Sequence, residues 1–239
     1  MRKALGGIVL LWGLKIFAQQ PIYRFNDAQL WFNLYLQKKV NSKLNIHLNQ
    51  QDRWKENVTE FHFAYADVGL TYKFTKNIKV LADYVFTQKR RPDQSFNTVH
   101  QYYVAAAAKK DIMRWRFAYR LMYQFEFKNP YTSYYGFTPF RYIRNKFTVK
   151  YEYNKYFTFY VADELYAPLN SPQIKGIDRN RSFAGLFFNT FRHQQLELYF
   201  MYQNRLQSGA WFKQKNSDDF TDYILEKDFV YGIGYSIEF

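Results

Sequence analysis

The segment Asp228–Phe239 (DFVYGIGYSIEF) decides the fold class, because its two faces differ completely in an extended conformation. One face carries only large apolar or aromatic side chains: Phe229, Tyr231, Ile233, Tyr235, Ile237 and Phe239. The other face carries small or polar ones: Val230, Gly232, Gly234, Ser236 and Glu238. A strand that separates an apolar medium from a polar lumen has this pattern. An amphipathic strand of a soluble sandwich is the alternative for this segment taken alone.

The same period-two alternation recurs along the chain and predicts strands rather than helices. It covers residues 30–37, 44–51, 67–74, 78–87, 102–108, 114–126, 146–153, 157–164, 181–189, 196–203 and 229–239. Short connections at 40–43, 75–77, 110–111, 154–155 and 192–194 alternate with long ones at 55–60, 89–99, 128–140, 167–179 and 205–223. Short periplasmic turns and long outer loops are typical of outer-membrane barrels.

These segments predict an all-β protein, a single-chain antiparallel transmembrane β-barrel. They number eleven, whereas single-chain bacterial barrels have an even number of strands. A short additional strand at Gln20–Phe25 would give about twelve, which we prefer, and one misplaced segment would give ten. A secreted β-sandwich is the alternative fold.

The composition supports the barrel. Aromatic residues make up 22% of the chain, with 25 Phe and 23 Tyr, yet the sequence is polar overall. A barrel with an apolar, aromatic-belted exterior and a polar interior accounts for both properties. The chain contains no Cys, which excludes disulfides and thiolate chemistry. Only helices and closed barrels satisfy backbone hydrogen bonds within lipid.

The N-terminus is typical of a secretory signal peptide. A basic start, Met1–Lys3, precedes an apolar stretch and a small residue, Ala18. We therefore expect a signal peptide at residues 1–18 and an outer-membrane barrel domain at 19–239, although an N-terminal membrane anchor is an alternative. The expected location is the outer membrane of a Gram-negative bacterium. Expected partners are outer-membrane lipid and lipopolysaccharide, and the assembly machinery that would recognise the terminal signal Tyr235, Ile237 and Phe239.

The formal net charge is +14, and about +11 remains without the signal peptide. A basic surface suggests nucleic acid, anionic lipid or acidic ligands. Export excludes nucleic acid and leaves lipopolysaccharide phosphates and small anionic solutes.

Six segments of the chain carry a resemblance to a known family: Trp31–Leu36 (WFNLYL), Leu44–Arg53 (LNIHLNQQDR), Val68–Phe74 (VGLTYKF), Arg141–Phe147 (RYIRNKF), Val161–Tyr166 (VADELY) and Arg179–Gly185 (RNRSFAG). They resemble the DUF2490 family of uncharacterised outer-membrane barrel proteins, mostly from Bacteroidota. The resemblance extends over nearly all of residues 19–239, and Asp163–Tyr166 is its most distinctive part. It implies an outer-membrane β-barrel and no established activity.

The inward faces of the predicted strands carry a cluster of charges. The cations are Arg114, Arg116, Arg120, Arg144, Lys146, Lys150 and Arg181, and the anions are Asp67, Asp83, Glu126, Glu152, Glu164 and Glu197. Charges inside a narrow barrel must be paired or hydrated. One interpretation is a structural or binding barrel closed by ion pairs. The other is a narrow, anion-biased pore.

An enzyme is the minority hypothesis. A lipid-modifying or hydrolytic site at the outer rim would use His62 and His100, but no Gly-x-Ser-x-Gly motif occurs. Sequence spacing identifies no catalytic residue, metal ligand or cofactor. The long loops at 167–179 and 205–222 are polar with aromatic residues, and loops on rigid scaffolds often bind partners.

Overall fold

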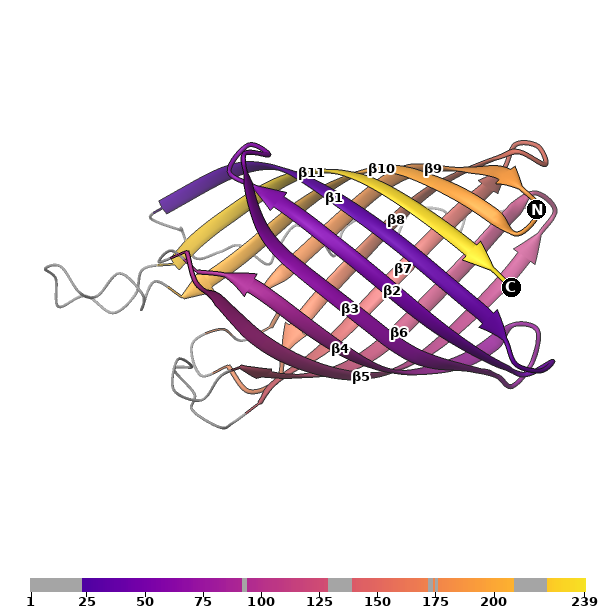
Figure 1. The fold of residues 1–239 in the computed structure, drawn as a ribbon, viewed down its shortest axis with the longest axis horizontal. Helices are drawn as coiled ribbons and strands as arrows, with labels where there is room; N and C mark the ends of the chain where they lie inside the picture. The colour runs from indigo at the N-terminus through magenta and orange to yellow at the C-terminus, as the bar shows by residue number, and fades with distance from the viewer. Residues whose placement is uncertain (1–22, 92–93, 129–138, 172–173, 175, 209–222) are drawn as a thin grey trace, which may run out of the picture.

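The computed structural model describes residues 23–91, 94–128, 139–171, 174, 176–208 and 223–239, which form one closed β-barrel (Figure 1). The strands are β1 (Tyr23–Lys39), β2 (Leu44–Lys55), β3 (Glu60–Lys73), β4 (Ile78–Arg90), β5 (Phe96–Ile112), β6 (Trp115–Lys128), β7 (Phe140–Glu152), β8 (Phe157–Pro168), β9 (Arg179–Phe191), β10 (Gln194–Ser208) and β11 (Tyr223–Glu238). The predicted all-β barrel is confirmed. The predicted signal peptide, residues 1–18, lies outside the described residues.

The strand number is close to the expectation, whereas the closure of the barrel differs from it. The described residues form eleven strands, one fewer than the preferred twelve and one more than ten. Tyr23–Phe25, the described part of the proposed additional strand, is the beginning of β1. β1 runs parallel to β11, in register from Tyr23↔Ile224 to Gln37↔Glu238. With an odd number of up-and-down strands, the first and last necessarily point the same way, so the barrel closes by a parallel pair.

The two ends of the barrel differ, as the alternation of connection lengths predicts. The short turns and the C-terminus lie at one end in Figure 1, and the strand ends that the long connections join lie at the other. Side chains fix the short turns: Asn41 accepts the backbone N–H groups of Lys43 and Leu44 at 2.9 and 2.8 Å. Asn154 does the same in the turn before β8. These are the local side-chain bonds that make Asn frequent in turns.

One predicted turn was misplaced. We expected it at Lys110-Asp111, but β5 continues to Ile112, which pairs with Trp115 of β6. Met113 and Arg114 therefore make a two-residue turn, and Met113 has φ of 53°. A positive φ is unusual for a residue with a side chain such as that of Met, so the sequence did not predict a turn at Met113.

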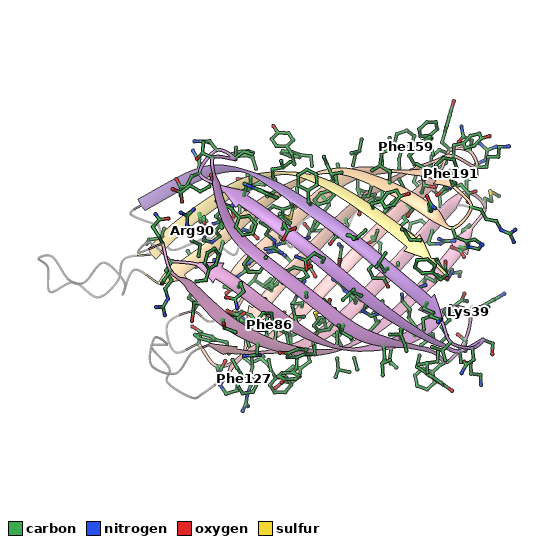
Figure 2. The ribbon with its side chains drawn as sticks, viewed as in Figure 1. Lys39, Phe86, Arg90, Phe127, Phe159 and Phe191 are labelled. Carbon is green, nitrogen blue, oxygen red and sulfur yellow. The ribbon has the colours of Figure 1, made fainter. Side chains whose placement is uncertain are left out.

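The outward face is apolar over the middle of the strands. Exposed aliphatic side chains there include Leu34, Leu48, Val68, Val104, Leu121 and Val161. Aromatic side chains lie toward both ends. From the strand bounds, Phe74, Trp115, Tyr153, Phe159 and Phe191 are near the short turns, and Phe86, Phe96, Tyr102 and Phe127 are nearer the long connections. Figure 2 labels Phe159 and Phe191 at the first end and Phe86 and Phe127 toward the second. No helix among the described residues is long and apolar enough to cross a membrane.

Inside the barrel, an apolar cluster covers the wall around the closing strands. Trp31, Met201 and Val230 are buried there, with Phe183 and Tyr199 packed against them. Gly232 makes room for this packing, because a Cβ at its position would lie 1.9 Å from Cζ of Tyr199. Part of the lumen is thus filled by side chains.

Candidate functional site: a cationic lumen

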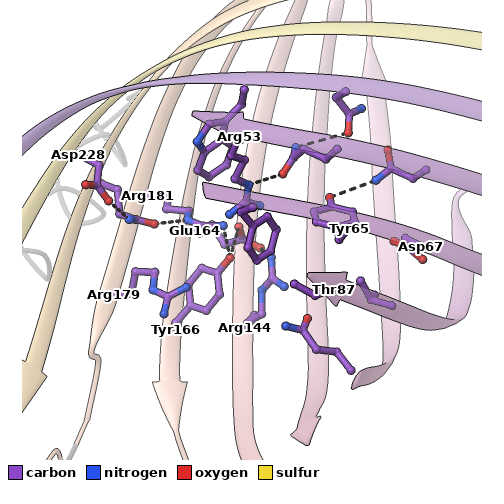
Figure 3. A pocket seen from close by; sticks show the side chains of 18 of the residues that line it. Arg53, Tyr65, Asp67, Thr87, Arg144, Glu164, Tyr166, Arg179, Arg181 and Asp228 are labelled. Carbon is purple, nitrogen blue, oxygen red and sulfur yellow. Dashed lines mark hydrogen bonds and ion pairs between the residues drawn. The ribbon is translucent and has the colours of Figure 1, made fainter. Parts of the chain in front are cut away.

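The half of the lumen toward the long connections contains a cavity of about 960 Å³. Figure 3 shows part of its wall, where charged and aromatic side chains from several strands converge. Twelve Lys or Arg residues line it, against five Asp or Glu residues. The wall therefore has a formal surplus of seven positive charges. Such a surface attracts anions and repels cations.

Glu164 of β8 is the main anionic centre of this wall. Its side chain is almost fully buried, and Oε1 lies 2.8 Å from Nη2 of Arg120 and 2.9 Å from Nη2 of Arg144. Oε2 accepts a hydrogen bond from the Tyr166 hydroxyl. Arg144 also donates to Gln124 at 2.9 Å. One carboxylate thus joins cations from β6 and β7 to a tyrosine on its own strand.

Other cations of the lumen rest on aromatic rings. The guanidinium of Arg53 lies 3.6 Å from the ring centre of Trp31 and 4.5 Å from that of Phe63. Lys146 and Lys150 lie 4.2 and 4.0 Å from the rings of Phe183 and Phe187. Cation–π contacts hold these charges in place without neutralising them.

A chain of hydrogen bonds continues across the wall to β11. Arg181 donates through Nη1 to the Tyr166 hydroxyl at 2.5 Å and through Nε to Gln203 at 2.6 Å. Gln203 in turn donates to Asp228, which is completely buried. These bonds connect β8, β9, β10 and β11 within one polar network (Figure 3).

Most of the predicted lumen charges do lie inside the barrel. The cavity is lined by Arg120, Arg144, Lys146, Lys150, Arg181, Asp67, Glu126, Glu164 and Glu197. Asp83 is buried on β4 beside His47, with 2.7 Å between Oδ1 and Nε2. The cluster is therefore distributed over several strands rather than concentrated on one.

Three of the predicted charges lie near the short turns instead. The prediction that Arg114 faces the lumen was wrong. Arg114 is exposed in the turn between β5 and β6, because β5 is longer than predicted. Arg116 pairs with Asp111 at 2.6 Å, and both side chains are nearly half exposed. Glu152 is exposed at the end of β7.

Several residues of the site were not predicted from the sequence, although their alternation along the strands indicates them. Arg53 continues the inward positions His47, Asn49 and Gln51 of β2, and all but His47 line the cavity. Asp228 lies two residues before Val230 on β11 and therefore faces the same, inward side. The same alternation also identifies Arg179, Tyr166, Gln203 and Trp31. Counting polar residues by parity along every strand would have found them.

The two rim histidines do not meet. His62 lines the cavity. His100 lies among outward-facing residues: its Nδ1 is 2.8 Å from the Tyr84 hydroxyl, and its ring contacts Phe86. They are on opposite sides of the barrel wall, so the described residues do not bring them into one hydrolytic or metal site.

A second cavity, of about 430 Å³, lies at the end with the short turns. Its wall includes Tyr35, Gln37, Gln195 and Glu238. No described residue lines both this cavity and the larger one.

The loop before β9 contributes one further buried acid. The peptide N–H of Asp178 donates to the Tyr166 carbonyl at 3.0 Å, and its carbonyl accepts from Leu206 at 2.7 Å. Burial raises the pKa of the Asp178 carboxyl above its usual value, since it disfavours the charged form. The predicted partner-binding segment at 205–222 extends largely outside the described residues.

Comparison with known proteins adds a family and a structural neighbour. The profile of a family described as "Protein of unknown function (DUF2490)" matches residues 28–214. No curated protein matches the chain. Among solved structures, a crystal structure of the NanC porin in a rhombohedral form has a TM-score of 0.50 at 14% identity. The match covers 89% of this chain and 99% of the porin. At this identity the similarity concerns the fold alone.

Proposed function

Since the chain belongs to the DUF2490 family of proteins of unknown function and folds as a porin-like barrel, we propose that it is an outer-membrane protein whose lumen is a narrow, anion-biased pathway. The observation that carries this proposal is the surplus of seven positive charges on the wall of the larger cavity. Small anionic solutes are the substrates that such a wall favours.

The exterior supports the location. An aliphatic band bordered by aromatic side chains, as on this barrel, is the surface that lipid-embedded barrels present. Phospholipid and lipopolysaccharide would surround it, with the long connections facing outward. The exposed aromatic side chain of Phe239, together with Tyr235 and Ile237, would act as the signal for the assembly machinery after cleavage of residues 1–18.

The ion pairs around Glu164 support a narrow path rather than a wide channel. They join side chains of β6, β7 and β8 inside the barrel, where they occupy part of the lumen. Lys146 and Lys150 are the cations best placed to attract a solute. They lie over aromatic rings, and among the described residues neither forms an ion pair.

The test is the reversal potential of the folded protein in a planar bilayer under a salt gradient. We expect anion selectivity that weakens when Lys146→Gln and Lys150→Gln are combined, because two charges of the surplus disappear. The matched control is Lys39→Gln with Lys43→Gln, two exposed lysines at a short turn, which should leave selectivity unchanged. A correctly folded barrel without conductance would refute the pathway and leave a closed structural or binding barrel. Equal effects of both pairs would refute the role of the lumen lysines.

A further inference from the structure

A separate cluster lies on the inward faces of β2, β3 and β4. It consists of His47, Asp67 and Asp83, all buried, whose nearest donor atoms lie within 4.8 Å of one another. Strand register brings them together: His47 pairs with Gly69, which pairs with Asp83, and Asp67 precedes Gly69 by one inward position. Their spacing along the chain matches no ligand motif, so sequence alone predicted no metal there. We propose that these three residues bind a divalent transition-metal ion such as Zn²⁺.

Among the described residues, the only potentially cationic side chain that pairs with the carboxylates of this cluster is His47, which is charged only when protonated. The Asp83 side chain has no exposed surface, and its Oδ2 has no hydrogen-bond partner among the described residues. Oδ1 of Asp67 also has no hydrogen-bond partner among the described residues, and Asp67 is only 5% exposed. Glu164 is held by two arginines, but within the described part of the chain no Lys or Arg pairs with Asp67 or Asp83. Buried carboxylates with unused oxygens are costly unless a cation or a proton joins them.

The backbone is shaped so that two ligand atoms converge. An ideal Cβ on Gly69 would lie 1.3 Å from Asp83 Oδ1 and 2.6 Å from His47 Nε2. The carboxylate and the imidazole therefore meet directly above a residue that has no side chain. Any other residue at position 69 would occupy the space where they meet.

Neighbouring side chains orient the ligands as outer-shell groups do in metal sites. The Tyr103 hydroxyl donates to Oδ2 of Asp67 at 2.9 Å, which leaves Oδ1 to bind. The ring of Tyr35 stacks on His47, with 5.5 Å between centroids and an interplanar angle of 29°. Both contacts restrict the orientation of a proposed ligand.

One imidazole nitrogen and two carboxylate oxygens suit a borderline divalent ion better than Mg²⁺ or Ca²⁺, which prefer oxygen ligands alone. His47 Nε2 and Asp83 Oδ1 are 2.7 Å apart. Around tetrahedral Zn²⁺ they would be about 3.3 Å apart, so this pair must open by about 0.6 Å. The Asp67 oxygen, which lies within 4.8 Å of both, must come to a similar distance. Asp67 also lines the larger cavity, so an ion can enter from the lumen, and a remaining coordination position would face it.

The experiment measures Zn²⁺ binding to the full chain, folded in detergent, stripped of metal and without an affinity tag, by equilibrium dialysis and elemental analysis. We expect one ion per chain in the wild type and loss of that ion in Asp83→Asn and in His47→Gln. Tyr103→Phe should weaken binding by roughly 10–100-fold, because it removes an outer-shell bond. The matched control is Asp163→Asn, which alters an aspartate that Asn180 and Ser182 already bond, and it should retain the ion.

Co²⁺ absorption of the wild type provides a measurement that does not depend on any variant folding. Visible bands of a four- or five-coordinate site, displaced by Zn²⁺, would support the proposal. Absence of such bands and of bound Zn²⁺ would overturn it, and would indicate that a shared proton holds the cluster together. Equal Zn²⁺ binding by the wild type, Asp83→Asn and His47→Gln would also overturn it, since the ion would then bind elsewhere.

Discussion

Replacing Glu164 by Gln tests whether the ion-pair network stabilises the barrel. The change keeps the shape of the side chain and removes the negative charge that Arg120 and Arg144 share at 2.8 and 2.9 Å. Leaving a buried charge without its partner costs roughly 3–5 kcal/mol. Arg120 is 32% exposed to the cavity and Arg144 keeps its bond to Gln124, so we expect about 3 kcal/mol, at the lower end of this range.

The assay is equilibrium unfolding by urea in lipid vesicles, followed by tryptophan fluorescence and extrapolated linearly to zero denaturant. A double-mutant cycle of Glu164→Gln with Arg144→Gln should give a coupling energy of about 1–2 kcal/mol. Glu152→Gln is the control, because Glu152 is exposed at the end of β7, and it should change stability by less than about 0.5 kcal/mol. If Glu164→Gln were as stable as the wild type, the network would not hold the barrel together and our argument would fail.

Three further predictions concern packing, the surface and pH. Gly232→Ala should destabilise the barrel by roughly 1–3 kcal/mol in the same urea assay, because the new Cβ would overlap the Tyr199 ring. Gly234→Ala should destabilise it less, because the nearest atom to a Cβ at that position, Oε2 of Glu197, is 3.1 Å away. Asp111→Asn, which removes an exposed ion pair, should leave the urea midpoint unchanged within error, and a clear shift would contradict our view of that pair. Asp178→Asn should stabilise the protein at pH 7, because a raised carboxyl pKa means that the folded state loses stability as the group ionises. That gain in stability should disappear below about pH 4, where the Asp178 carboxyl is protonated in the unfolded state too. A gain that does not vary with pH would show that ionisation of Asp178 is not its cause.

The inward or outward direction of most residues could be predicted from the sequence, since alternation in a strand fixes it. Lys146, Lys150 and Glu164 were assigned to the lumen for this reason, and they do line the cavity. The prediction failed at Arg114, because β5 did not end at Lys110 and Asp111 but continued to Ile112. The turn therefore falls at Met113 and Arg114, and the positive φ of Met113 has no sequence signature.

The contacts between strands could not be predicted. Glu164 meets Arg120 across β7, from a position 44 residues away along the chain. That contact depends on the register of two successive strand pairs, which alternation does not determine. The same holds for His47, Asp67 and Asp83, which come together only through the pairing of β2, β3 and β4. The parallel pairing that closes the barrel could not be predicted either, because the hydrophobic pattern of a strand is the same for parallel and antiparallel neighbours.

The parallel pairing of β1 with β11 has a consequence for rearranging this chain. Tyr23 and Phe239 lie at opposite ends of the barrel, so a circular permutant cannot join them with a hairpin turn. A connector must run the length of a strand of roughly 55 Å, which requires about 16 extended residues. Duplication or deletion of a whole hairpin, in contrast, changes the strand number by two and preserves the parallel pairing. Relatives that differ by complete hairpins would therefore inherit this closure, and only gain or loss of a single strand would abolish it.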